Sequence, residues 1–229
     1  MKVMGIISMR PRALDLFCCS GGAGMGLHQA GFDVVGVDIE AQPRYPFEFH
    51  QADALTYPLD GFDFIWASPP CQAHTALRTM HNAREHADLI PQTRERLAAS
   101  GVLYVIENVV GAPLRSPIML CGTMFGLGIE TAELRRHRIF ETGPDYWTIP
   151  HPPCRHRKRT IGVYGGGHGV SLHRHAKGQP SFTAEQERAA MGMPWATVDG
   201  LSQAIPPAFA ECIGRAALAR LSIMREAAE

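Results

Sequence analysis

A cysteine and a glutamate stand where two apolar runs of the sequence end. Cys71 follows two prolines after the apolar stretch 62–67, and Glu107 directly follows the apolar stretch 102–106. Both stretches have the length and composition of buried strands, so we expect the thiol and the carboxyl group at one edge of a sheet. A thiolate is a nucleophile and a carboxyl group can act as its acid partner. The pair suits covalent addition to an electron-poor ring.

Each of these residues also has a plain structural interpretation. A lone cysteine is usually a small buried hydrophobic residue, and a glutamate at a strand end can simply accept structural hydrogen bonds. A cysteine held behind Pro69 and Pro70 is, however, not in a typical core position. The interpretation of Glu107 as an acid depends on its place beside Cys71. A reactive thiol also needs a lowered pKa, which the sequence does not show.

A glycine-rich turn separates a short apolar run at 13–17 from a helical stretch that ends near Gly31. Such glycines let the backbone approach a ligand at the positive end of a helix, although many glycine-rich turns are only tight connections. Asp38 closes the next strand, at 34–39, where a carboxylate can hold ribose hydroxyls. Asp53 closes a further short segment. These positions favour a nucleoside-type cofactor, and no Gly-Lys-Ser/Thr sequence indicates a triphosphate loop.

Two arginines, Arg136 and Arg138, stand two residues apart in the run 134–140. On an extended chain they share one face. There they could hold a phosphate or a base edge, and the alternative is a solvent-exposed edge strand.

The first half of the chain alternates strand-like and helix-like segments. The alternation predicts an α/β fold with a mostly parallel, twisted sheet and helices on both faces. Ligands of such sheets bind beyond the carboxyl ends of the strands. Two late helices are also expected, one with Thr183 and Gln186 in a capping box and one that starts at two prolines. The predicted strands are 13–17, 34–39, 62–67 and 102–106, and the predicted helices include 82–100 and 206–229.

The chain is neutral overall, but its basic residues gather in one irregular stretch. Residues 144–182 contain six basic residues and one acidic residue, which gives this segment a net charge of +5 and leaves −5 for the remainder. A local basic patch is typical of phosphate-binding surfaces. We expect nucleic-acid contacts from Arg155, Arg157, Lys158 and Arg159.

The six cysteines are scattered, which does not indicate a disulfide framework, and 229 residues can form a core without one. We therefore expect a reducing, cytoplasmic setting in a prokaryote or a viral host. The apolar runs are about as long as strands, so no membrane partner is expected. The first twelve residues do not resemble a secretion signal. We expect a monomer.

Taken together, these motifs resemble those of the DNA cytosine-5 methyltransferase family, in the family's order and over nearly the whole chain. The similar segments are its S-adenosylmethionine loop (15–26), nucleophile motif (69–72), acid motif (107–109), paired arginines (136–138) and two late motifs (191–194 and 202–207). The resemblance implies a Rossmann-like methyltransferase fold with a small, irregular, basic recognition segment. Residues 1–143 and 183–229 would form the catalytic domain, and 144–182 the inserted segment.

The resemblance also implies a reaction and its site residues. Cys71 would bond to C6 of a flipped cytosine in DNA, Glu107 would act at N3, Arg138 at the pyrimidine carbonyl and Arg136 nearby, and C5 would receive a methyl group. S-adenosylmethionine would be the cofactor and S-adenosylhomocysteine the product. The implied cofactor contacts are Phe17, Ser20, Gly22, Asp38, Ile39, Asp53, Ala54, Pro70, Gln203, Ala204 and Ile205.

The chain departs from the family pattern at two places. The family usually has Asn where Gln203 stands, which affects one cofactor contact. Only about fifty residues separate Arg138 from Met191, where the family usually has a substantial recognition domain. Phosphate contacts give affinity without sequence information, so we expect a short or relaxed target sequence.

A zinc site is a further hypothesis for the irregular segment. His151, Cys154 and His156, with three histidines downstream (His168, His173 and His175), could supply ligands. Their spacing matches no firm zinc pattern, and histidine beside arginine is common on phosphate-binding surfaces. No metal ligand is therefore assigned.

Two other functions stay open. The short recognition segment favours a non-catalytic DNA-binding accessory protein with the same fold, whereas the intact Cys71 and Glu107 oppose it. The same chemistry could also act on RNA or transfer a group other than methyl.

Overall fold

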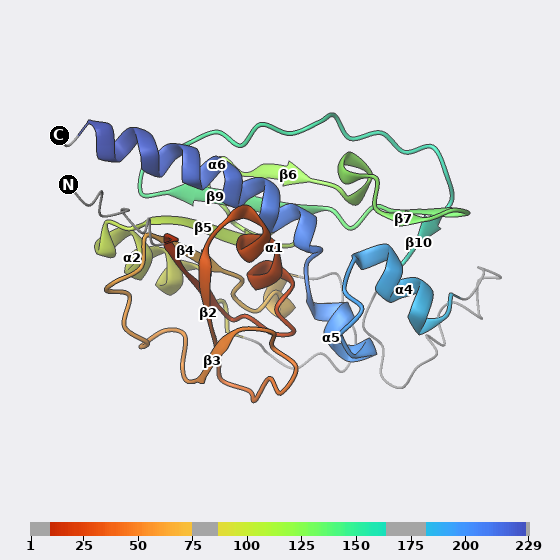
Figure 1. The fold of residues 1–229 in the computed structure, drawn as a ribbon, viewed down its shortest axis with the longest axis horizontal. Helices are drawn as coiled ribbons and strands as arrows, with labels where there is room; N and C mark the ends of the chain where they lie inside the picture. Colours follow the sequence, from red (N-terminus) through yellow and green to blue (C-terminus); the bar gives the residue numbers. More distant parts are fainter. Residues whose placement is uncertain (1–9, 75–86, 164–181, 228–229) are drawn as a thin grey trace, which may run out of the picture.

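The structure is a computed structural model that describes residues 10–74, 87–163 and 182–227. A large sheet lies between helices, and a small sheet lies beside it (Figure 1). In chain order, with η for 3-10 helices, the described elements are β1 (Arg12–Leu16), α1 (Gly22–Ala30), β2 (Asp33–Asp38), β3 (Glu48–Gln51), β4 (Phe64–Ala67), η1 (Gln72–His74), α2 (Ile90–Ser100), β5 (Leu103–Asn108), β6 (Ile118–Leu120), η3 (Gly122–Phe125), β7 (Gly128–Ile129), β8 (Ala132–Leu134), β9 (Arg138–Gly143), β10 (Thr160–Ile161), α4 (Ala184–Met191), α5 (Val198–Gln203) and α6 (Pro207–Glu226).

The large sheet has seven strands in the order β3-β2-β1-β4-β5-β9-β6. The first five of these strands pair in parallel, and β9 runs antiparallel to both of its neighbours. The mostly parallel α/β sheet predicted from the sequence is therefore confirmed. Its four predicted strands correspond to β1, β2, β4 and β5, each within two residues at either end.

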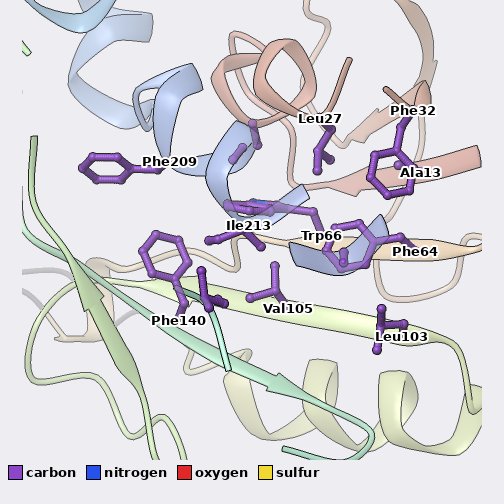
Figure 2. Packing of buried hydrophobic residues seen from close by; sticks show 14 of the residues in the cluster. Ala13, Leu27, Phe32, Phe64, Trp66, Leu103, Val105, Phe140, Phe209 and Ile213 are labelled. Atoms are coloured by element: carbon purple, nitrogen blue, oxygen red, sulfur yellow. The ribbon is translucent and has the colours of Figure 1, made fainter. Parts of the chain in front are cut away.

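Side chains alternate between the two faces of the sheet and build a core on each. On β4, Phe64 and Trp66 face the cluster that includes Leu27 of α1 and Phe209 of α6. Figure 2 shows these rings between the helices and the sheet. The alternate residues of β4 pack on the other face with Leu97 of α2. Burial on both faces explains why these strands are continuous apolar runs in the sequence.

Most helix predictions agree with the structure. Thr183 caps α4 in a complete capping box with Gln186, and α6 begins at Pro207, one residue after the predicted start. The helix predicted at 82–100 begins only at Ile90, and its residues 82–86 lie outside the described part of the chain.

The prediction that residues 134–140 form one extended run is wrong. β8 ends at Leu134 and β9 begins at Arg138, and between them Arg136 adopts a positive φ of 32°. The backbone therefore turns between the two arginines, and they do not share the face of one strand.

A second core lies beside the large sheet. Here β10 pairs in parallel with β8, and β7 completes a three-stranded sheet. Ile161 and Val163 pack in this cluster with Leu134, Met191 and Leu201. The predicted recognition segment thus contributes two residues to a core shared with parts of the predicted catalytic domain. Among the described helices, none has both the length and the apolar character needed to cross a bilayer.

Candidate active site

The parallel strands of the large sheet end level with one another. Leu16 pairs with both Val37 and Ala67, and Ala67 pairs with Ile106. The next residue of each strand or loop therefore emerges at the same edge, and these residues are Phe17, Asp38, Ser68 and Glu107. This edge carries the candidate site, as expected for a parallel α/β sheet.

Glu107 forms a buried ion pair with Arg138 at this edge. The Arg138 Nε atom lies 3.0 Å from Glu107 Oε1, and both side chains are largely shielded from solvent. Burial raises the pKa of Glu107, while the nearby Arg138 and a hydrogen bond from Ser68 oppose that rise. Ser68 is held in turn by Trp66 Nε1, which donates to its hydroxyl at 2.9 Å. The raised pKa lets Glu107 keep its proton at higher pH than a free glutamate, which suits an acid.

Cys71 lies just beyond β4, immediately before η1, and is partly buried. Burial raises the pKa of its thiol, and the negative charge of Glu107 raises it further, whereas Arg138 lowers it. The free protein therefore holds Cys71 mainly as the thiol rather than as the nucleophilic thiolate. The lowered pKa that reactivity requires is not present in this state.

Asn108 connects the two segments that hold Cys71 and Glu107. It is buried at the end of β5, its Nδ2 donates to the carbonyl oxygen of Pro69 at 2.9 Å, and its Oδ1 accepts from the amide of Val109 at 2.9 Å. The sequence motif contained Asn108 but assigned it no role. A polar residue that ends an otherwise apolar buried strand was the available signal.

Arg136 is directed at the main chain. Its guanidinium donates to the carbonyl oxygens of Val163 at 2.6 Å and Ser202 at 2.8 Å, and also to those of Leu201 and Ala204. The side chain is buried. The structure therefore places Arg138 beside Glu107. It places Arg136 between the residues after β10 and the late motif at 202–207.

The glycine turn before α1 packs against the late motif at 202–207. Gly21 has a φ of 76°, a left-handed conformation that favours glycine. A Cβ on Gly22 would lie 2.1 Å from the carbonyl oxygen of Ile205, so only glycine fits this close approach. The Cys19 thiol donates to Gln203 Oε1 at 3.7 Å. Gln203 and Ile205, two predicted cofactor contacts, are thus brought against the turn, and Ala204 lies buried between them.

Two carboxylates and an exposed apolar side chain lie at or beyond the carboxyl ends of β2 and β3. Asp38 accepts from the amides of Cys19 at 2.9 Å and Glu40 at 3.0 Å, which fixes its carboxylate at the edge. The apolar side chain of Ile39 beside it is 67% exposed, a surface that a ring could cover. Asp53 is exposed after β3, and its carboxylate accepts from the amide of Leu55. Apolar surface beside carboxylates fits a base with its ribose. The other predicted contacts differ in exposure: Phe17 and Ser20 are partly buried, Ala54 is buried and Pro70 is exposed.

Asp15 lies buried below the turn. Tyr45 Oη donates to Asp15 Oδ2 at 3.0 Å. Burial raises the pKa of Asp15 to about 8, against the lowering effect of this hydrogen bond. Near neutral pH, the protonated and uncharged form of Asp15 is therefore favoured beneath the glycine turn.

Comparison with known proteins supports the fold. No family model matches the chain, and no curated protein matches it. The solved structure of the S. pombe Dnmt2 methyltransferase matches with a TM-score of 0.55 at 13% identity, over 93% of this chain and 99% of that chain. The chain has a Rossmann-like methyltransferase fold.

Two further structures are similar over part of the chain. A protein described as a DNA modification methyltransferase, from an E. coli prophage, has 20% identity over 57% of this chain and a TM-score of 0.42. This chain spans 45% of that protein's length. The Pyrococcus abyssi tRNA (uracil-54, C5)-methyltransferase, solved with S-adenosyl-L-homocysteine, has 18% identity over 58% of this chain, covers 33% of its own and gives a TM-score of 0.37.

The four basic residues predicted to bind nucleic acid are exposed on the segment before β10. Glu133 of β8 anchors this segment, because its Oε2 accepts from the amides of Arg157 and Lys158, both at 2.9 Å. The guanidinium of Arg159 lies 5.3 Å from the ring centre of Phe182. Arg155, Arg157 and Lys158 also line a pocket of about 580 Å³ together with residues of η3, β7 and β8. This pocket is separate from the site at Cys71.

Proposed function

We propose that the protein transfers a methyl group from S-adenosylmethionine to C5 of cytosine in DNA, through a covalent bond between Cys71 and C6. The proposal rests mainly on the ion pair of Glu107 with Arg138, 3.0 Å apart, at the strand ends beside Cys71. An accessory protein that only binds DNA has no need for a thiol and a protonatable carboxyl group held together in this way.

The residues of the site can perform the addition and its reversal. Cys71 loses its proton to solvent and adds as a thiolate to C6 of the cytosine, and Glu107 donates its own proton to N3, which lets the ring accept the added electron pair. S-adenosylmethionine would supply an electrophilic methyl group to the activated C5. Loss of the C5 proton, release of the N3 proton and departure of Cys71 then restore the aromatic ring. The enzyme is recovered with a free thiol.

The resting pKa values give substrate binding a role in activation. Glu107 disfavours the Cys71 thiolate, and Arg138 favours it. A protonated Glu107 carries no charge and no longer opposes the thiolate, whereas the positive charge of Arg138 still favours it. We infer that the thiolate forms mainly in the complex with the flipped base. The free thiol is thereby protected from side reactions.

Arg138 is the arginine proposed to contact the base, and Arg136 is proposed as a positioning residue. Because Arg136 binds the carbonyls of Leu201, Ser202 and Ala204, it fixes the late motif over the glycine turn. Asp38, Ile39 and the exposed Asp53 are the proposed contacts of the cofactor's adenosine.

DNA is the proposed partner because the exposed basic residues before β10 can hold phosphates. The faces of the cytosine ring, from which C6 and C5 must be approached, are covered by stacked neighbours inside a duplex, so the cytosine must be flipped out, at a cost of a few kcal/mol. Phosphate contacts contribute affinity without reading sequence. The proposed target is therefore short or relaxed.

Methyl transfer can be tested with purified protein, duplex DNA and labelled cofactor, followed by base-resolution mapping and mass identification of the product. We expect 5-methylcytosine with the wild type, none with Cys71→Ala, and unchanged activity with Cys212→Ala, a partly buried cysteine on α6. The Cys71→Ala variant should still bind the cofactor. Product from RNA and not from DNA, or normal turnover by Cys71→Ala, would contradict the proposal.

A further inference from the structure

Four side chains from three separate parts of the sequence converge beside β9. They are Cys121 at the end of β6, His137 immediately before β9, and Cys154 and His156 in the segment that follows β9. One ligand atom from each lies within 4.8 Å of the others. Cys121 is buried, His137 and Cys154 are partly buried and His156 is exposed. The cluster contains two sulfur atoms, two imidazole nitrogens and no carboxylate.

The separations between sulfur and nitrogen atoms in this cluster are close to those of a tetrahedral metal site. Cys154 Sγ lies 3.1 Å from His156 Nε2 and 3.5 Å from His137 Nε2, and Cys121 Sγ lies 3.4 Å from His156 Nε2. In a tetrahedron with zinc–sulfur bonds of about 2.3 Å and zinc–nitrogen bonds of about 2.05 Å, sulfur and nitrogen are about 3.5 Å apart. These three separations are thus close to those of a tetrahedral site, and all four ligand atoms lie within 4.8 Å of one another.

We propose that Cys121, His137, Cys154 and His156 bind one Zn²⁺ in a closed structural site. Thiolate and imidazole ligands in a tetrahedral arrangement select zinc over hard cations such as Mg²⁺ or Ca²⁺, which prefer oxygen. Four protein ligands leave no open position for a water or a substrate, so the ion is structural rather than catalytic. Thr123 Oγ1, 3.2 Å from Cys121 Sγ, supplies an outer hydrogen bond of the kind that orients ligands.

A zinc ion at this site would connect the basic stretch around Arg155 and Arg157 to the candidate active site. Cys154 and His156 belong to the stretch that includes Arg155 and Arg157, while His137 lies between Arg136 and Arg138. A bound ion would thus fix the position of the basic side chains relative to the arginine that pairs with Glu107. It would also order the described part of the basic segment, because a metal crosslink can order a segment too short to form its own core.

The sequence alone did not indicate Cys121 or His137 as partners of Cys154 and His156. His151 is not a member of the cluster, and the three histidines downstream lie outside the described residues. Cys121 and His137 are 33 and 17 positions before Cys154, too far for a short zinc motif, and pairing of β6 with β9 brings them together.

The wild-type protein gives the first test. Protein expressed with zinc in the medium and dialysed against metal-free buffer should contain one zinc per chain by plasma mass spectrometry. After replacement with Co²⁺, its absorption spectrum should show tetrahedral d–d bands and a thiolate-to-cobalt charge-transfer band. Neither measurement depends on a variant that folds. Metal-free protein that also gives no cobalt spectrum, or a disulfide between Cys121 and Cys154 in freshly prepared protein, would overturn the proposal.

Matched variants locate the site. His156→Ala removes an exposed ligand and should weaken zinc affinity, measured by chelator competition, by at least about tenfold. Cys154→Ser should remove the charge-transfer contribution of one thiolate. His151→Ala and Cys212→Ser lie outside the cluster and should keep one zinc with unchanged affinity. Equal zinc loss in these two controls would place the ion elsewhere. Methyl transfer is not needed for any of these readouts, so they are independent of the proposed function.

Discussion

The side-chain amide of Asn108 donates a hydrogen bond to the carbonyl oxygen of Pro69 at 2.9 Å. Asn108 directly follows Glu107 on β5, and Pro69 lies two residues before Cys71. This one bond thus connects the strand that holds the acid with the turn that holds the thiol. Because the bond is buried, water cannot replace either partner without a rearrangement.

Replacement of Asn108 by alanine should impair the positioning of Cys71 and leave cofactor binding unchanged. The loss leaves a buried carbonyl without its donor, and we expect a stability cost of about 1–3 kcal/mol. Misplacement of a reacting group by about 1 Å can cost about a hundredfold in rate, so methyl transfer should fall at least about tenfold. Cofactor affinity should stay the same. Single-turnover kinetics and calorimetric cofactor binding test this prediction, and an unchanged rate would show that the bond does not position Cys71.

The pKa of Cys71 should respond in opposite directions to its two charged neighbours. Glu107→Gln removes a negative charge and should lower the pKa of the thiol, whereas Arg138→Gln removes a positive charge and should raise it. The pH dependence of iodoacetamide alkylation at Cys71, followed by peptide mass spectrometry, measures both shifts. Cys212 in the same samples is the internal control. Shifts of the same sign in both variants would disprove the electrostatic description of the site.

The buried ion pair of Arg94 with Glu141 should contribute strongly to stability. Arg94 of α2 donates to both carboxylate oxygens of Glu141 on β9, at 2.7 and 2.8 Å. Arg94→Met leaves a buried carboxylate without its positively charged partner and should lower the free energy of unfolding by about 3–5 kcal/mol.

An exposed pair offers the control for this experiment. Arg215→Met breaks the 2.6 Å pair of Arg215 with Glu211 on α6 and should cost less than about 1 kcal/mol. Urea unfolding measures both variants. Equal losses would show that burial does not determine the contribution of Arg94.

The buried Asp15 should make stability depend on pH. Its pKa is about 8 in the folded protein and 3.8 in an unperturbed carboxyl group, so the folded state binds its proton more tightly. The stabilising effect of that proton is complete below about pH 4 and is lost as the pH rises through about 8. Asp15→Asn cannot ionise and should become progressively more stable relative to the wild type across this window. Urea midpoints at several pH values test the trend, and a difference that does not change with pH would contradict it.

The large sheet could be predicted from the sequence because burial of a strand leaves a local pattern of apolar residues. A strand buried on both faces is apolar over most of its length, and β4 and the first four residues of β5 show this in sequence as uninterrupted apolar runs. The capping box of α4 could also be predicted from the sequence. The side chains of Thr183 and Gln186 each accept a hydrogen bond from the other residue's backbone amide within one turn. The order of strand ends then placed Cys71 and Glu107 at one edge.

The remaining features depend on tertiary contacts. Arg136 has a positive φ and binds carbonyls some 65 residues later, and no local pattern encodes these distant partners. The raised pKa values of Glu107 and Cys71 arise from burial, which becomes visible only when the sheet and its loops are assembled. The partners of Cys154 are set by the pairing of β6 with β9.

The covalent bond between Cys71 and a flipped cytosine is the central claim, and 5-fluorocytosine tests it most directly. Fluorine at C5 cannot leave as a proton does, so the adduct is trapped after methyl transfer. Wild-type protein incubated with S-adenosylmethionine and a duplex that contains 5-fluorocytosine should form a stable complex. Peptide mass spectrometry should locate the methylated nucleotide on Cys71, and Cys71→Ala should form none. A wild-type protein that binds the cofactor and this duplex, methylates ordinary cytosine and yet forms no adduct at Cys71 would contradict the mechanism.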